Sequence, residues 1–180
     1  MKKAVIVALS FACLAGTGYA EWLAEGQQSL RLDYVYADDS GSEGAHGAEI
    51  GFGTALYDLD DVAVYYMYME NDDMDAQQLG LSVQQHIPCP TGNIPLVPYV
   101  GAAMGYGWLD TVGSGVAGAD LDKGGWLARL ELGAVYQLCD YFALNAGARF
   151  NYSTHDIFLN ESGGTDDTMW TFVLGGRFYY

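Results

Sequence analysis

Basic residues are scarce in this chain: 7 lysines and arginines stand against 23 aspartates and glutamates, a net charge of −16 over 180 residues. Because nucleic acids are bound through basic patches, this deficit argues against a nucleic-acid partner. Charged residues make up only 17% of the chain and aromatic residues 14%, which disfavours disorder. With 4 prolines and no low-complexity tract, nothing marks a linker between domains. The composition predicts one ordered domain with unusually many glycines (24) and tyrosines (14).

Long apolar runs are missing after the first twenty residues. Those twenty begin with Lys2 and Lys3, continue with an apolar stretch over residues 4–15 and end on small residues. This pattern predicts a secretory signal peptide, residues 1–20, cleaved before Glu21. The apolar stretch is shorter than the roughly 20 residues of a transmembrane helix. Cleavage leaves five basic and 23 acidic residues, a net charge of −18, in one domain over residues 21–180.

In that domain the hydrophobic period is two, the period of β-strands. Large apolar residues such as Leu30 and Leu32 alternate with small or polar ones such as Arg31. The alternating runs cover residues 29–36, 47–56, 78–84, 100–108, 126–136, 142–152 and 170–180, and a further run over 62–69 is apolar on both faces. The sequence therefore predicts about eight strands of roughly ten residues, the length of a tilted strand that crosses a bilayer.

The connections between these runs differ in length and polarity. Those over residues 38–45, 70–76, 109–124 and 155–167 are polar and mostly long, whereas those over 58–61 and 138–140 are tight and that over 87–95 is rich in proline. Long loops at one end and short turns at the other are typical of an outer-membrane barrel. The predicted fold class is all-β, a transmembrane antiparallel up-and-down β-barrel, with both termini and the turns in the periplasm.

Arginine decides which face of the strands meets lipid. The alternative is a soluble barrel that turns its large apolar residues inward. Four of the five basic residues of the domain lie on the face rich in small residues: Arg31, Arg129, Arg149 and Arg177. An arginine facing lipid near the midplane costs about 2–4 kcal/mol, so four of them would cancel most of a typical stability of about 5–15 kcal/mol. The arginines are therefore expected in the lumen.

Acidic residues share this inner face, and the predicted lumen network comprises Arg31, Asp33, Glu49, Arg129, Glu131, Arg149 and Arg177. Counting from the turn ends places Asp33 opposite Arg177 with Arg31 close by. Because an unpaired buried charge is costly, we expect these residues to form a connected network. In a barrel of about eight strands the interior is only wide enough for side chains, so such a network would close it.

The motifs PYVGAAMGYG (residues 98–107) and GGRFYY (175–180), together with the signal peptide, resemble the small outer-membrane β-barrels related to the transmembrane domain of outer membrane protein A. The resemblance implies location in the outer membrane of a Gram-negative-type bacterium. It also implies that the terminal aromatics Phe178 and Tyr180 are the signal recognised by the barrel-assembly machinery. The sequence ends at Tyr180, so a periplasmic domain that binds peptidoglycan is not expected.

Two cysteines, Cys89 and Cys139, fall in predicted periplasmic turns. The periplasm is oxidising, and the two turns are near neighbours on the rim, so we expect a disulfide between them. Two unpaired thiols are the alternative.

Catalytic and metal-binding patterns are weak. Ser153 and His155 share a strand face, but the order is the reverse of the His-x-Ser order typical of lipid A deacylases, so we expect no enzyme and no cofactor. His46 and His86 are isolated at strand ends and are expected in solvent, and no metal site is predicted.

Acidic residues gather in the four loops: Asp38, Asp39, Glu43, Glu70, Asp72, Asp73, Asp75, Asp110, Asp120, Asp122, Glu161, Asp166 and Asp167. None of these segments fits an EF-hand, so diffuse attraction of divalent cations is expected rather than a dedicated site. Such cations would bridge the loops to outer-membrane lipids and lipopolysaccharide. The sequence thus favours a monomeric barrel with a plugged lumen that acts through its loops. A porin-like channel for small solutes or hydrophobic ligands is the alternative, and a lipid A-modifying enzyme is less favoured.

Overall fold

The computed structural model describes residues 26–37, 44–57, 60–70, 74–87, 96–111, 123–159 and 165–180. Within these residues the strands are β1 (Gln28–Ala37), β2 (His46–Tyr57), β3 (Asp60–Glu70), β4 (Met74–His86), β5 (Leu96–Thr111), β6 (Lys123–Cys139), β7 (Phe142–Ser153), β8 (Phe158–Leu159), β9 (Thr165–Asp166) and β10 (Thr168–Tyr179). No helix in these ranges is long and apolar enough to cross a membrane.

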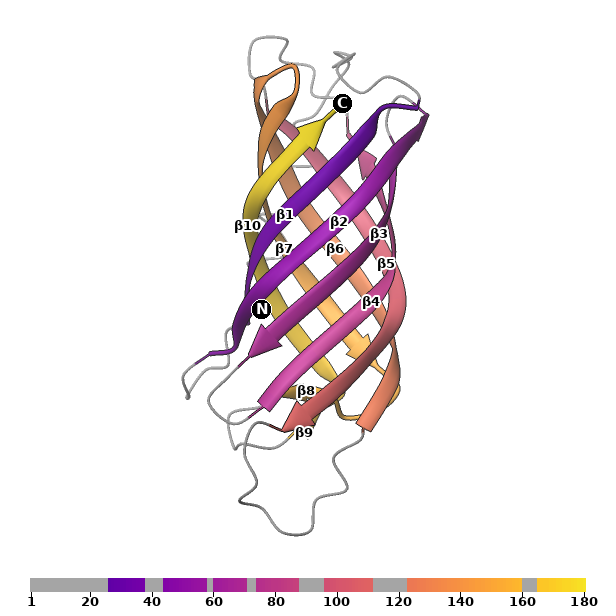
Figure 1. Ribbon diagram of the computed structural model, residues 1–180, viewed down its shortest axis with the longest axis vertical. Helices are drawn as coiled ribbons and strands as arrows, with labels where there is room; N and C mark the ends of the chain where they lie inside the picture. The colour runs from indigo at the N-terminus through magenta and orange to yellow at the C-terminus, as the bar shows by residue number, and fades with distance from the viewer. Residues whose placement is uncertain are drawn as a thin grey trace.

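Eight of the strands close into a barrel in the order β1-β10-β7-β6-β5-β4-β3-β2 (Figure 1). Each barrel strand pairs antiparallel with its neighbours, and β1 closes the barrel against β10. The predicted up-and-down barrel of about eight strands is therefore confirmed. The two-stranded hairpin of β8 and β9 is additional to the barrel, and it lies at the loop end, the lower end in Figure 1.

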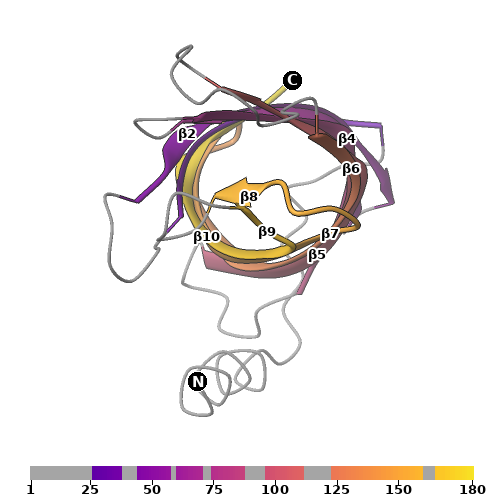
Figure 2. The ribbon, with the colours of Figure 1, turned by 90° about the horizontal axis from the view of Figure 1, so that it is seen from below.

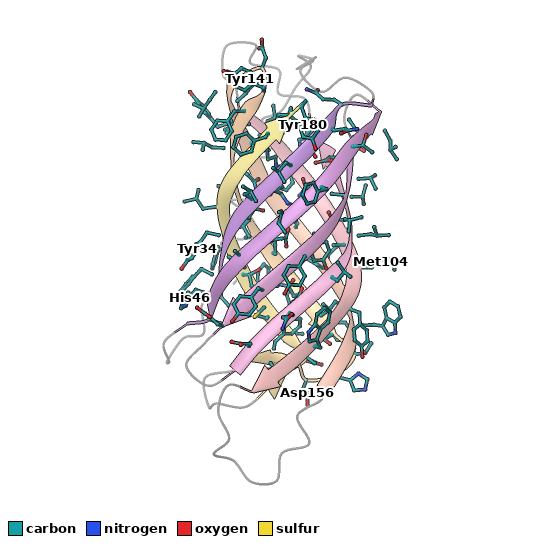
Figure 3. All side chains as sticks on the ribbon, in the orientation of Figure 1. Tyr34, His46, Met104, Tyr141, Asp156 and Tyr180 are labelled. Carbon is teal, nitrogen blue, oxygen red and sulfur yellow. The ribbon has the colours of Figure 1, made fainter. Side chains whose placement is uncertain are left out.

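The two faces of the barrel differ as the period of two predicts. Outward-facing Leu130 is 64% exposed, whereas Arg129 beside it is 3% exposed. Met104 and Tyr34 point away from the barrel, and Tyr141 and Tyr180 stand at its turn end (Figure 3). The run that was apolar on both faces belongs to β3, where Tyr65 faces inward among buried residues. Because successive side chains of a strand point to opposite faces, this fixes the orientation of all of β3.

Strand limits differ from the sequence runs at both ends of the barrel. Strands β5 and β6 extend past their runs at the loop end, and their pairing continues as far as Leu109 and Lys123. At the turn end, Asp61 belongs to β3 and not to the tight turn in which it was predicted. Register shifts between Ala55 and Tyr57 and between Gln137 and Cys139 mark irregular pairing beside two of the turns.

Glycines on the inner wall receive the large inward side chains. A Cβ atom added at Gly80 would lie 2.8 Å from Cε1 of Tyr65, and one added at Gly147 would lie 2.8 Å from the hydroxyl of Tyr99. A side chain at either position would therefore overlap the ring that occupies the space. This close approach explains why a narrow barrel with inward tyrosines such as Tyr65 and Tyr99 needs many glycines.

Candidate functional site: the charged lumen

Arg149 is the centre of the charged lumen. Its guanidinium is completely buried, and its Nη2 lies 2.9 Å from Oδ2 of Asp33. Its Nη1 lies 3.0 Å from Oε2 of Glu49, and its Nε lies 3.2 Å from Oε1 of Glu131. The three carboxylates come from β1, β2 and β6, so this one side chain ties together strands that are distant around the barrel.

Glu49 is shared by three arginines. Besides Arg149, its carboxylate accepts hydrogen bonds from Arg31 and, at 2.7 Å, from Nη1 of Arg129. Nε of Arg31 lies 3.4 Å from Oδ2 of Asp33. Together with Glu131 these residues form a central cluster of three cations and three anions, which is neutral as a whole. Neutrality matters because a buried unpaired charge is far more costly than a buried ion pair with good geometry.

Two tyrosine rings cover two of the arginines. The guanidinium carbon of Arg129 lies 4.1 Å from the centroid of the Tyr65 ring, and that of Arg177 lies 4.9 Å from the Tyr99 ring. The Tyr99 hydroxyl also donates a 2.7 Å hydrogen bond to Glu131. An aromatic face stabilises a desolvated cation, so both rings contribute to the charged lumen as well as filling it.

Arg177 does not face Asp33, which corrects one detail of the predicted network. In the observed register Arg177 lies opposite Arg31, and Asp33 lies opposite Gly175. The physical reason is the shear of the barrel, which offsets heights counted from the turn ends. Arg177 instead approaches Asp61, with 3.8 Å between its Nη1 and Oδ2 of that carboxylate.

Asn145 links the central cluster to the pair of Arg177 and Asp61. Its amide nitrogen donates to Oδ1 of Asp33 at 3.0 Å, and its amide oxygen accepts from Nη2 of Arg177 at 3.3 Å. His86, expected in solvent, is buried, with its Nε2 3.3 Å from Nη1 of Arg177. Neither residue was predicted for the lumen. The excess of four arginines over three acids was the signal that a fourth acid, Asp61, was missing from the predicted set.

The other predicted residues lie at the ends of the barrel. Phe178 and Tyr180 point outward at the turn end. The Phe178 ring packs against the Phe142 ring, with 4.8 Å between the two ring centroids. Cys139 is half-buried and forms no disulfide with a described residue. Cys89 lies outside the described residues, so the disulfide stays a prediction.

Ser153 and His155 are not arranged as a nucleophile and its base. The Ser153 hydroxyl is buried and accepts a hydrogen bond from the backbone N–H of His155. The imidazole Nδ1 of His155 lies 3.1 Å from the hydroxyl of Thr154 instead.

Most of the loop acids lie outside the described residues. Of those with described side chains, Glu70 lies 3.6 Å from His46 and accepts a 3.0 Å hydrogen bond from the Tyr68 hydroxyl. Among the described residues no group of three or more histidine, cysteine or acidic side chains could hold a metal ion.

No family model and no curated protein matches this chain. Solved structures do. The N-terminal β-barrel domain of Pseudomonas aeruginosa OprF superposes with a TM-score of 0.60 at 20% identity, covering 87% of this chain and 100% of that domain. Neisserial surface protein A superposes with a TM-score of 0.61 at 18% identity, covering 84% of this chain and 94% of that protein. Outer membrane protein H (OprH) of P. aeruginosa, solved in DHPC micelles, superposes with a TM-score of 0.60 at 15% identity. The match covers 86% of this chain and 99% of that protein. The chain thus has the fold of the small eight-stranded transmembrane barrels that its sequence resembles.

Proposed function

We propose that this chain is a monomeric integral protein of a Gram-negative-type outer membrane, with a closed lumen and a structural or surface-interaction role carried by its acidic loops. The contrast between the two faces of the wall supports this most strongly. Outward positions are held by large apolar side chains such as Leu81 and Leu174, which suit lipid, while all four arginines of the described residues face inward. The predicted leader and the terminal Phe178 and Tyr180 are consistent with export and with recognition by the barrel-assembly machinery.

The charged network supports a closed lumen. The side chains of Arg31, Asp33, Glu49, Arg129 and Arg149 are all at most 4% exposed, and each is paired with an opposite charge. In a barrel of this size side chains of that bulk fill the cross-section. Steady passage of solutes would require the ion pairs to separate, and each separated charge would be left without its partner.

A small-solute channel is the second candidate, and one observation favours it. The hydroxyl of Ser82 and both amide atoms of Gln84 are buried and have no hydrogen-bond partner among the described residues. Buried polar groups are normally satisfied, if not by protein then by water. Water beside β4 would give this part of the lumen a polar path.

Two measurements test the proposal. After fractionation of expressing cells, we expect the protein in the outer membrane, and we expect boiled and unboiled samples to migrate differently on a gel. A soluble protein with identical migration would refute the barrel in the membrane. The folded protein should then show no steady conductance in a planar bilayer, whereas steady single channels would favour the second candidate.

A further inference from the structure

The lumen changes chemistry towards its loop end. There, on one side of the lumen, buried inward residues form an apolar layer of Val35, Ala37, Ala45, Tyr65, Met67, Met69, Ala76, Leu109 and Val173. Val35, Gly47, Met69, Ala76 and Leu109 are successive partners across β1 to β5, so they line one side of the barrel continuously.

On β1, β2 and β6 the inward positions nearest the loops lie one inward step beyond the charges, whereas on β3 Met67 is the register partner of Glu49 and Tyr65 covers Arg129. On β1, Val35 is the inward residue that follows Asp33 towards the loops, and on β2, Gly47 precedes Glu49. On β6, Leu127 likewise precedes Arg129. Since inward residues recur every second position, a molecule that entered from the loop end would meet the apolar layer before any charge.

The hairpin of β8 and β9 covers this layer. Seen along the barrel, β8 and β9 lie across the opening (Figure 2). Ile157 and Phe158 are 3% and 1% exposed, and they pack with Leu127 and Met169. Met169 also packs against the apolar layer, so hairpin and layer are continuous.

The Ile157 side chain packs into a space in the wall beside Gly107. A Cβ atom added at Gly107 would lie 2.8 Å from Cδ1 of Ile157, so this glycine leaves the room that the isoleucine fills. Gly107 is the register partner of Gln78, which is buried on β4. The Ile157 side chain therefore lies over the part of the wall where Gln78 faces the lumen.

The hairpin is held less strongly than the barrel wall. Among the described residues it has two paired positions, Phe158 with Asp166 and Leu159 with Thr165. Its base is fixed by backbone hydrogen bonds of 2.7 Å from Ser153 to Asp167 and 2.9 Å from Thr154 to Trp126. Elements with few paired positions open locally at a fraction of the cost of global unfolding. Among the described side chains, those of Ile157 and Phe158 are buried against the wall and hold this hairpin in place.

We infer that the lumen has a second, independent closure: an apolar seal at its loop end, formed by Ile157 and Phe158 against Leu127 and Met169, which opens without disturbing the ion pairs beneath it. The inference rests on the proposed function, because it concerns the same closed lumen. It places the point of control at the cell surface, where a contact with the loop over residues 155–167 would shift the hairpin. It assigns the charge network the role of a fixed inner barrier.

Thiol labelling tests the seal. The parent is Gln78→Cys in a chain that also carries Cys89→Ser and Cys139→Ser, folded in detergent micelles and treated with a charged, membrane-impermeant methanethiosulfonate. We expect slow labelling in the parent and labelling at least about tenfold faster when Ile157→Ser and Phe158→Ser are added, because labelling of a buried thiol follows the population of the open form. Phe158→Ala alone is the milder variant and should give a smaller increase.

Two controls separate the seal from the network. Trp170→Ser removes an outward-facing aromatic from β10 and should leave labelling unchanged. Glu131→Gln alters the ion pairs and should also leave it unchanged, provided that the unboiled sample still migrates as a folded barrel. Fast labelling of the parent, or no increase in a folded seal variant, would overturn the inference. An equal increase from Glu131→Gln would show that the two closures are one. A protein that fails to enter the outer membrane refutes the proposed function and leaves these labelling results unaffected.

Discussion

Glu131 and Arg149 face each other as register partners on β6 and β7, with 3.2 Å between Oε1 of the carboxylate and Nε of the guanidinium. Both side chains are almost completely buried, and the Tyr99 hydroxyl donates a hydrogen bond to the carboxylate oxygen that forms this ion pair. The pair therefore joins the central charges to the aromatic residues that surround them.

Glu131→Ala is expected to destabilise the barrel by about 3–5 kcal/mol, because removing one partner of a buried pair leaves the other charge uncompensated. Urea unfolding in lipid vesicles, followed by tryptophan fluorescence, would measure the loss. Glu70→Ala is the matched control, since that carboxylate is about half exposed, and its loss should be within about 0.5 kcal/mol. Equal effects of the two substitutions would contradict the role given to Glu131.

Gly147→Ala tests the fit of Tyr99 into the wall. The added methyl group would lie 2.8 Å from the Tyr99 hydroxyl and 2.9 Å from the backbone oxygen of Leu132, so the ring must move and its hydrogen bond to Glu131 must weaken. Overpacking of this kind costs about 1–3 kcal/mol. The same unfolding assay applies. In a Tyr99→Phe chain, which has no hydroxyl at this place, Gly147→Ala should cost less, and an undiminished cost would assign the effect to the backbone.

The predicted disulfide between Cys89 and Cys139 is open to a direct measurement. Closing a loop of about 50 residues contributes about 4 kcal/mol in the chain-entropy model, less any strain. We expect mass spectrometry of non-reduced peptides from periplasmically exported protein to show the two cysteines joined, and reduction to lower the stability. Both thiols recovered free would contradict the prediction.

Divalent cations should stabilise the barrel in membranes that contain lipopolysaccharide. All arginines of the described residues are buried in the lumen, so none of them can pair with lipid phosphates, while the loop acids repel those phosphates. Mg²⁺ can neutralise both groups at once. We expect EDTA to lower, and Mg²⁺ to restore, the midpoint of thermal unfolding in such membranes but not in zwitterionic vesicles. If neither EDTA nor Mg²⁺ changes the midpoint of thermal unfolding, bridging of the loops to lipid phosphates by cations is excluded.

The barrel and its polarity could be predicted from sequence because one local rule decides them. Alternation of side chains along a strand places Arg31 inward as soon as Leu30 and Leu32 are outward, whatever the rest of the chain does. The partner of Arg177 could not be predicted in the same way. It depends on barrel shear, which is a property of the whole closed sheet. Counting along single strands put Arg177 opposite Asp33, where the closed sheet places Gly175.

The hairpin at the loop end was missed for a different reason. The sequence predicts one polar loop over residues 155–167, although Ile157, Phe158 and Leu159 stand together within it. Three neighbouring apolar residues in a polar loop are a signal for burial, but periodicity gives no information on a strand of two residues. Nothing in the local sequence indicates that the mouth of the barrel is the place where they are buried.

The order of the two closures gives the last prediction. The apolar seal and the charge network lie one after the other along the lumen, so opening the first leaves the second in place. The Ile157→Ser and Phe158→Ser chain should therefore remain at baseline in a planar bilayer, as the wild-type protein should, even though labelling at position 78 increases. The reason is that the ion pairs of Arg149 to Asp33, Glu49 and Glu131 span the barrel beneath the seal. Steady channels from the seal variant alone would show that the ion pairs are no barrier, and steady channels from the wild-type protein would show that neither closure holds.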